Sequence, residues 1–320
     1  MNKRERLDAA IRGAAVDRIP FGVWWHMSTQ LLGAGPTADM HLAMLEHCDV
    51  DFVKLMNDDP YPVPDAFTAV RNEDDWLRFA DAARTQPPFS KQLEVIERVR
   101  AVAGDGVHVL ETVFDPFGVA RRTGKDRIFE LMRERPDVFA EGLDAITVSL
   151  ENYLREAVHR GASGVYLAVY GVGPFFSSDG SGYDRLTADE FRRFVAPYDR
   201  RILTVAQELG IVKFVHLHGD ELLFDEVLDY PMDVLNWAHL HTPPTLGEAR
   251  RRTDVCLMGG FNESMTNMYH PDEVVRTVNE TAREAGTRKF VFGPGCALPA
   301  DLPIAYVDVM RASVRALATT

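Results

Sequence analysis

The amino-acid sequence predicts a single α/β domain, a (β/α)8 TIM barrel over residues 1–320 with a short N-terminal helical extension. Short apolar runs alternate eight times with longer segments of helical periodicity, which indicates a parallel sheet. Eight strands close naturally into a barrel. An open doubly wound sheet is the alternative. The first strand, however, is followed by Trp24-Trp25-His26-Met27-Ser28 rather than a glycine-rich phosphate loop.

The individual elements follow from local patterns. The predicted strands, bounded by Gly, Pro, Asn or Asp, are Ile19–Trp25, Asp51–Met56, Val107–Val113, Gly164–Tyr170, Ile211–His216, Met232–Trp237, Val255–Met258 and Lys289–Phe292. The segments with helical spacing are Leu31–Cys48, Phe89–Ala103, Val138–Arg160, Thr187–Leu209 and Pro271–Ala285. Asn57–Pro64 is predicted to be a loop. The glycine- and serine-rich stretch Tyr170–Tyr183 is predicted to be a mobile lid or a long surface loop.

Composition and charge exclude several classes of protein. The 46% apolar and 26% charged fractions are those of a globular protein. The net charge of −13 argues against binding to nucleic acid or to acidic membranes. No apolar run approaches the ~20 residues of a membrane span. Three scattered cysteines do not form a disulfide framework, so we expect a cytoplasmic protein.

The strongest functional signal is His216-Leu217-His218-Gly219, with Cys296 in Gly293-Pro294-Gly295-Cys296. Residues i and i+2 of a strand face the same side, so both imidazoles can face one cavity. The carboxyl ends of barrel strands share one mouth, which allows Cys296 to approach the histidine pair. Two histidines and a thiolate are a three-ligand set for Zn²⁺ that leaves a fourth position open. Alternatively, backbone groups hold the histidines and the cysteine is a small buried hydrophobe.

Other polar and aromatic residues follow the predicted strands. An acidic residue there can transfer protons or hold a metal-binding histidine, and Glu263 is a possible fourth zinc ligand. Helix capping, solvated charges and core packing are the competing interpretations. Adjacent strand residues face opposite sides, so one of Trp24 and Trp25 is favoured as a residue that lines the pocket. The predicted catalytic residues are Glu111, Asp58 and Tyr170, and the predicted substrate-binding residues are Trp24, Trp25, His26, Asn57, Trp237 and Asn262.

Several blocks together resemble the uroporphyrinogen decarboxylase superfamily over almost the full length. They are Lys3-Arg4-Glu5-Arg6-Leu7, Ile11-Arg12-Gly13, Val16-Asp17-Arg18-Ile19-Pro20, Pro197-Tyr198, His216-Leu217-His218-Gly219, Leu235-Asn236-Trp237, Met258-Gly259-Gly260, and Gly293-Pro294-Gly295-Cys296-Ala297-Leu298-Pro299 with Pro303. The resemblance implies a (β/α)8 barrel, which agrees with the strand count. It also implies a possible homodimer, since members of this superfamily often dimerise.

Two branches of the superfamily differ in their chemistry. True uroporphyrinogen decarboxylases need no metal and hold the substrate carboxylates with an Arg-Gln-Ala-Gly-Arg run after the first strand. Here that place reads Trp25-His26-Met27-Ser28-Thr29, without arginine. The other branch resembles methylcobamide:coenzyme M methyltransferases, which hold zinc with His-x-Cys and a later cysteine. This sequence keeps His216 and Cys296 but has His218 in place of the middle cysteine, which puts the thiol substrate in doubt rather than the metal.

The resemblance to the second branch implies zinc-dependent group transfer, most readily of a methyl group, between a small methylated substrate or a corrinoid and a thiol. No spare segment of ~100 residues lies outside the barrel, so we expect any corrinoid (cobalamin) to be supplied by a partner protein or from solution. A metal-free decarboxylase is the first alternative, with Arg121 and Arg122 as the nearby cations. A non-catalytic barrel that binds a corrinoid or a thiol is the second.

Overall fold

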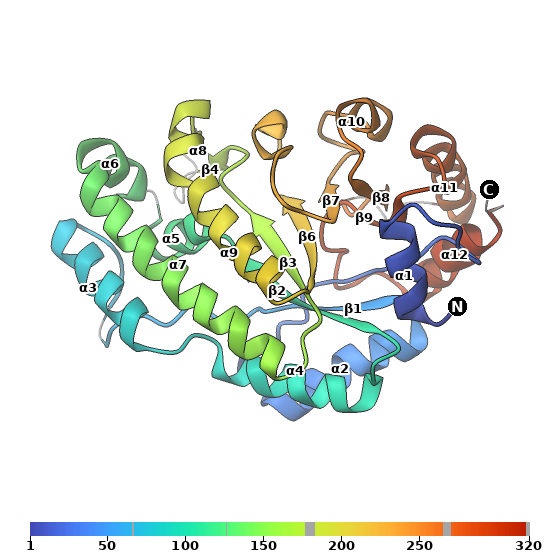
Figure 1. Ribbon diagram of the computed structural model, residues 1–320, viewed down its shortest axis with the longest axis horizontal. Coiled ribbons are helices and arrows are strands. Elements are labelled where there is room, and N and C mark those ends of the chain that lie inside the picture. Colours follow the sequence, from blue (N-terminus) through green and yellow to red (C-terminus); the bar gives the residue numbers. More distant parts are fainter. Residues whose placement is uncertain (66, 126, 177–182, 265–269, 318–320) are drawn as a thin grey trace.

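The computed structural model describes residues 1–320 except 66, 126, 177–182, 265–269 and 318–320. At its centre is a curled seven-stranded parallel sheet in the order β1-β2-β3-β6-β7-β8-β9, with helices around it (Figure 1). The strands are β1 (Phe52–Leu55), β2 (His108–Phe114), β3 (Gly164–Val169), β6 (Val212–Leu217), β7 (Val234–Trp237), β8 (Cys256–Phe261) and β9 (Phe290–Pro294), and a separate hairpin pairs β4 (Phe175–Phe176) with β5 (Tyr183–Asp184).

The helices alternate with these strands along the chain. They are α1 (Lys3–Ile11), α2 (Ala34–His47), α3 (Glu73–Thr85), α4 (Ser90–Ala103), α5 (Pro116–Gly124), α6 (Arg127–Glu134), α7 (Pro136–His159), α8 (Ala188–Phe194), α9 (Ala196–Glu208), α10 (Leu246–Arg252), α11 (Pro271–Ala285) and α12 (Ile304–Arg315), with short 3-10 helices η1 (Thr29–Leu31) and η2 (Phe224–Val227). Within the described ranges, no helix has the length and apolar character needed to cross a membrane.

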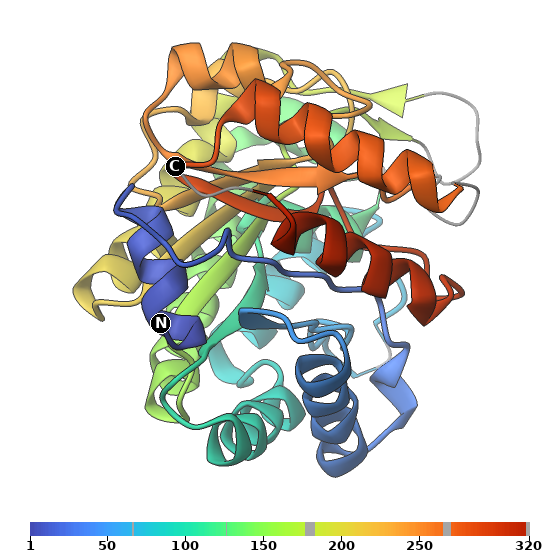
Figure 2. The same ribbon diagram turned by 90° about the vertical axis from the view of Figure 1, so that its right-hand side faces the viewer.

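The first predicted strand, Ile19–Trp25, differs from the prediction. It forms only isolated bridges, Phe21 with Phe292 and Trp25 with Leu298. Its backbone nevertheless lies along β9, where the Gly22 N–H donates to the Phe292 carbonyl at 2.9 Å (Figure 2). On its other side, the Phe21 carbonyl accepts a hydrogen bond from the amide of Asp51, just before β1. The prediction of eight regular strands is therefore not confirmed, whereas the seven parallel strands are.

Most predicted helices are confirmed, with one correction. The segment Thr187–Leu209 is two helices, α8 and α9, because Val195 interrupts it and Pro197 lies in the first turn of α9. Proline has no N–H to donate to the preceding turn and is tolerated at a helix start. The Tyr170–Tyr183 stretch includes β4, and residues 177–182 of it lie outside the described residues.

The sheet is buried on both faces, as in a barrel enclosed by helices. Residues that point inward form one cluster around Trp24, Tyr166 and Phe214, with Phe52 beside them. The close packing limits substitution: a Cβ on Gly22 would lie 2.3 Å from the Phe52 ring. The outer face of the sheet packs against the helices in a second, larger cluster.

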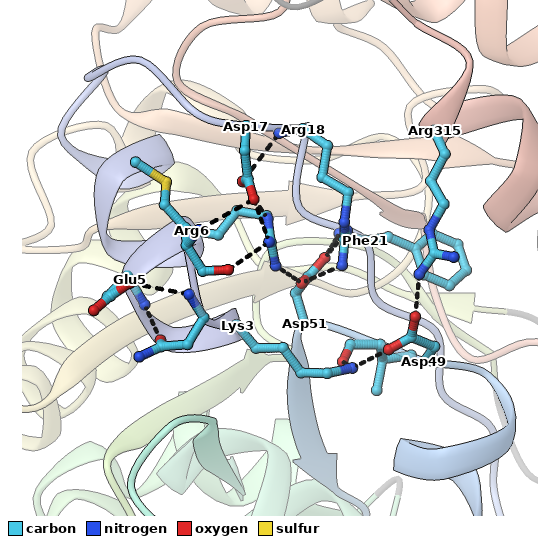
Figure 3. Close-up of polar contacts among 12 residues, drawn as sticks. Lys3, Glu5, Arg6, Asp17, Arg18, Phe21, Asp49, Asp51 and Arg315 are labelled. Carbon is cyan, nitrogen blue, oxygen red and sulfur yellow. Dashed lines mark hydrogen bonds and ion pairs between the residues drawn. The ribbon is translucent and has the colours of Figure 1, made fainter.

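A network of ion pairs holds α1 to the amino-terminal end of β1 (Figure 3). The carboxylate of Asp51 is fully buried and accepts hydrogen bonds from Arg6 Nη1 at 2.7 Å, from Arg18 Nη1 at 2.6 Å and from the Phe21 amide at 2.8 Å. Arg6 also binds both oxygens of Asp17 and holds the pKa of that carboxyl well below its usual range. Nearby, Lys3 and Arg315 both pair with Asp49. The network lies at the opposite end of the strands from the predicted site.

Candidate metal centre

The two histidines stand at the carboxyl end of β6. His216 is paired in register with Ala168 of β3 and Asn236 of β7, and the His218 amide continues the ladder by donating to the Val169 carbonyl at 3.0 Å. Extended backbone over this stretch places both imidazoles on the same side, as the i, i+2 spacing predicts. Cys296 follows β9 by two residues.

The three side chains converge. One ligand atom each from His216, His218 and Cys296 can be chosen so that all lie within 4.8 Å of one another. The Cys296 sulfur is 3.8 Å from His218 Nδ1. In a tetrahedral zinc site with bonds of ~2.0–2.3 Å, neighbouring ligand atoms are about 3.3–3.8 Å apart. The donor atoms are therefore close to the spacing that zinc requires, and the residues fit the metal.

Asn236 determines which nitrogen of His216 faces the other ligands. Its side-chain N–H groups donate to the carbonyls of Met258 and Pro294, each at 3.1 Å, so its oxygen is the acceptor for His216 Nδ1 at 2.7 Å. Tyr166 donates its hydroxyl to the same oxygen. His216 Nδ1 must then carry the hydrogen, which leaves the lone pair on Nε2. Metal-binding histidines are generally held in this way by their other nitrogen.

The protonation states also suit a metal. Burial lowers the pKa of His216 to about 3, with the neighbouring His218 adding to the effect. Burial likewise lowers the pKa of His218 to about 4, with His26 as the next cause. Both imidazoles are therefore neutral near pH 7, the form that coordinates metals. Burial raises the pKa of the Cys296 thiol, so in the metal-free protein the sulfur keeps its proton.

The convergent residues open into a cavity of about 720 Å³. The Tyr170 ring forms part of its wall and stacks on His218 with 4.2 Å between ring centroids. Two carboxylates and one guanidinium belong to the lining, from Asp220, Glu263 and Arg121. Glu263 Oε2 is buried without a hydrogen-bond partner among the described residues, and its carboxyl pKa is raised by burial. Glu263 lies outside the cluster of mutually close ligand atoms, so its role as a fourth ligand stays a prediction.

His26 and Asp58 form a pair. His26 Nδ1 is 2.6 Å from Asp58 Oδ1, and the Met27 amide donates to Asp58 Oδ2 at 3.1 Å. The backbone bridge of Trp25 with Leu298 brings this stretch alongside the loop that carries Cys296. The His26 side chain is 56% exposed.

The other predicted catalytic residue, Glu111, points away from the cavity. It is fully buried and accepts hydrogen bonds from Gln92 on α4, from Tyr153 on α7 and from Asn57. Burial raises its pKa to about 8, although these donors and the charge of Lys54 oppose the shift. Gln92 and Tyr153 belong to the helix layer outside the sheet, whereas Asn57 lies in the loop after β1. The catalytic role of Glu111 stays a prediction, and within the described residues it does not line the cavity.

The predicted substrate-binding residues are dispersed. Trp24 lies in the barrel interior against Tyr166, and Trp237 faces outward, where its indole donates to the Pro244 carbonyl. The Asn262 side-chain oxygen lies 2.7 Å from a ring nitrogen of His241. Of the residues predicted as catalytic or substrate-binding, Tyr170 alone lines the cavity as far as the structure is described.

Lys54 was missed by the sequence-based reasoning. Its ammonium lies inside the barrel, 3% exposed, 4.4 Å from the Tyr166 ring centroid and 5.3 Å from that of Trp24. It also donates to the Thr112 hydroxyl at 3.0 Å. Burial lowers its pKa to about 7, opposed by the charges of Cys296, Glu111 and Asp58. A single lysine within an apolar strand was the available signal.

The chain belongs to the uroporphyrinogen decarboxylase (URO-D) family, whose model matches residues 47–317. Among curated proteins, none matches the chain in sequence. A methyltransferase from Methanosarcina mazei superposes with a TM-score of 0.75 at 19% identity, covering 98% of both chains. A B12-independent methionine synthase from Shewanella sp. W3-18-1, in complex with selenomethionine, gives 0.60 at 12% identity, covering 93% of this chain and 92% of that one.

An endo-1,4-beta-mannanase from Rhizomucor miehei also superposes, with a TM-score of 0.52 at 9% identity over 92% of this chain and 95% of that one. At such identities these similarities show the fold. Because a methyltransferase, a methionine synthase and a mannanase share it, the reaction must be argued from the side chains of the site.

Proposed function

We propose that this protein is a zinc-dependent group-transfer enzyme that moves a methyl group at the cavity formed by His216, His218 and Cys296. The convergence of these three donors, with His216 held by Asn236, is the observation that carries the proposal. The fold similarity to a protein named as a methyltransferase, and to one named as a B12-independent methionine synthase, supports it. Three protein ligands leave one coordination position for a substrate.

Zinc at this position would lower the pKa of a bound thiol and favour the thiolate that acts as nucleophile. The protein's own side chains supply the surroundings. Asn236 keeps the His216 lone pair toward the site, and Tyr170 restricts the His218 ring by stacking. The cavity of about 720 Å³ accommodates a small substrate, and Arg121 places a positive charge on its wall.

The overall step balances without a redox partner. The thiol loses its proton to solvent, its sulfur forms a bond to the methyl carbon, and the bond from that carbon to the leaving group breaks with both electrons going to the leaving group. We propose that the methyl donor is a corrinoid carried by a partner protein. The reverse use, demethylation of a small methoxy or methylthio compound, employs the same site.

Metal analysis tests the proposal most directly. We expect about one equivalent of zinc per chain in protein purified without chelators, and loss of most of it in His216→Ala and Cys296→Ala. Cys256→Ala is the matched control, because Cys256 is buried in β8 outside the ligand cluster. Wild-type protein that binds less than about half an equivalent, or variants that keep it, would contradict the proposal.

Transfer itself is measured with methylcobalamin as donor and 2-mercaptoethanol as acceptor, with loss of the methyl–cobalt absorbance as readout. Turnover should require the metal and should stop in Cys296→Ala. Tight binding of either compound to zinc-loaded protein without turnover would instead favour the non-catalytic binding barrel.

A metal-free decarboxylase remains the second candidate because Arg121 lines the cavity and could pair with a carboxylate substrate. Turnover of uroporphyrinogen that is insensitive to chelators would establish it in place of methyl transfer.

A further inference from the structure

A second cavity, of about 350 Å³, lies beside the loop that follows β1 and is not used by the proposed reaction. Among the described residues, four aromatic side chains line it, from Tyr61, Phe67, Phe89 and Phe114. We refer to it as the aromatic cavity. Pockets for small ligands begin at about 300 Å³ and are lined mainly by apolar and aromatic side chains with a few polar groups. The aromatic cavity therefore has the size and the lining of a binding site for one small molecule.

The rings of the aromatic cavity are held in place by one another and by rings behind them. Tyr61 meets Phe79 and Phe89 edge to face, each with 5.8 Å between ring centroids. Phe89 in turn meets Tyr153 of α7 at 5.3 Å, and Phe67 lies against Phe79 at 5.9 Å. A ligand thus meets a preformed aromatic surface. An aromatic ligand gains from the same edge-to-face and offset contacts that hold these rings together.

The described lining also includes two cations, Arg122 in the last turn of α5 and Lys125 directly after it. The Arg122 guanidinium lies over the Phe114 ring, with Cζ 4.3 Å from the ring centroid. A guanidinium stacked in this way still directs its N–H groups outward in its own plane, where they can bind a carboxylate. Within the described part of the chain neither cation forms an ion pair, although the net charge of the protein is −13.

One carboxylate, that of Asp59, lines the aromatic cavity as well. Its Oδ1 lies 2.6 Å from the ammonium of Lys91 on α4, so its charge is compensated. The charges of Arg122 and Lys125 are not compensated by this pair. The aromatic cavity therefore carries a net positive charge and favours an anion over a neutral or cationic ligand.

We propose that the aromatic cavity binds a small aromatic carboxylate, with the ring among the aromatic side chains and the carboxylate on Arg122 and Lys125. A neutral aromatic compound leaves both cations without a partner, and an aliphatic acid forgoes the ring contacts. The site is separate from the metal centre. Phe114 lines the aromatic cavity and meets, at 5.6 Å between centroids, the ring of Tyr170, which lines the cavity of the metal centre. Binding here does not rest on the proposed function.

Equilibrium binding of 2-naphthoate to the intact protein, measured by calorimetry, tests the proposal. We expect saturable binding of one molecule per chain with a Kd of about 1 mM or tighter, as the size of this ligand allows. Arg122→Gln should weaken the binding about three- to tenfold, because the charged contact is partly open to solvent. Arg155→Gln is the matched control: Arg155 is a half-exposed arginine of α7 that pairs with Glu208, and this variant should bind as wild type does.

Two analogues separate the contribution of the charge from that of the ring. 2-Naphthamide has the ring without the charge, so it should bind wild type more weakly than 2-naphthoate does and should bind Arg122→Gln and wild type equally. Decalin-2-carboxylate keeps the charge and the carbon skeleton but has no aromatic faces, so it should bind more weakly than 2-naphthoate although it is more apolar. Tighter binding of the decalin acid would overturn the assignment to an aromatic ligand.

A carboxylate can also coordinate zinc, so Cys296→Ala distinguishes the two cavities. The affinity for 2-naphthoate should be unchanged in Cys296→Ala, whether or not the protein holds zinc or transfers a methyl group. Binding that is lost in Cys296→Ala but kept in Arg122→Gln would locate the ligand at the metal centre and overturn the proposal. Absence of saturable binding up to about 10 mM, or equal affinity of wild type and Arg122→Gln, would overturn it as well.

Discussion

Substitution of Asn236 by alanine should weaken zinc binding without touching a ligand. The Asn236 oxygen accepts from His216 Nδ1 and from the Tyr166 hydroxyl, each at 2.7 Å, and both groups are buried. Alanine removes the acceptor, so the His216 ring loses both its fixed hydrogen position and its orientation. Loss of such a partner typically lowers metal affinity about 10–100-fold, which corresponds to about 1.4–2.7 kcal/mol. The upper part of this range is expected, because water has little access to the 5% exposed His216.

Competition with a chromophoric zinc chelator measures the affinity, and urea unfolding of the metal-free protein measures stability separately. The second measurement is needed because alanine also leaves the carbonyls of Met258 and Pro294 without their donor. Tyr166→Phe is the matched control. It removes one donor to the same oxygen but keeps the His216 contact, so its zinc affinity should stay near wild type. If folded Asn236→Ala bound zinc as tightly as wild type, the orienting role of Asn236 would be refuted.

Three other substitutions test the fold and its ionisable groups. Asp51→Asn should lower the free energy of unfolding in urea by about 3–5 kcal/mol, because Arg18 loses its buried counter-charge and Arg6 keeps only that of Asp17; a loss below about 1 kcal/mol would contradict this. Glu111→Gln should flatten the pH profile of stability. Burial raises the pKa of Glu111 to about 8 in the fold, whereas in the unfolded chain the pKa is ~4.3. The stabilisation that the protonated Glu111 provides is therefore complete below pH ~4.3 and is lost as the pH rises toward 8. An unchanged profile would show that Glu111 is ionised in the fold. Gly142→Ala should destabilise by about 1–3 kcal/mol in thermal unfolding, because its Cβ would lie 2.2 Å from the Trp76 ring, whereas Gly106→Ala, with nothing within 4 Å, should change stability by less than about 0.5 kcal/mol.

The fold class was predictable because strand and helix periods differ and the chain repeats their alternation. The first predicted strand does not form a regular strand, and the reason is local. Within Ile19–Trp25, Pro20 has no N–H to donate, and the stretch pairs with β9 through few backbone hydrogen bonds around Phe292. An apolar run thus identified where the chain passes between β9 and β1, but not whether a continuous ladder forms there.

The candidate ligands were predictable because each constraint on them is simple. His216 and His218 share a side by alternation, and Cys296 follows the last strand of a parallel sheet whose carboxyl ends meet. Asn236 needed more information. Its pairing with His216 depends on the register between β6 and β7, which no local pattern encodes.

The side of the sheet that a residue faces was the main limit. Every residue of β2 is buried, so polarity does not alternate along it and the orientation of Glu111 could not be inferred. Leu110 belongs to the inner cluster, which turns Glu111 toward the helices. On β7 the same alternation sends Asn236 inward and Trp237 outward.

The burial of Lys54 could not be predicted from the sequence of its own strand. In Phe52–Leu55 one lysine among apolar residues looks like the solvent-facing position of an edge strand. Its burial depends on the rings of Trp24 and Tyr166, which come from two other segments far apart in sequence. A cation over aromatic faces is stabilised when those faces are assembled, so the curled sheet together with the segment that carries Trp24 makes the buried lysine tolerable. The positions of the residues that orient and surround the candidate centre therefore depend on the assembled sheet, whereas its ligands are already evident in the motifs.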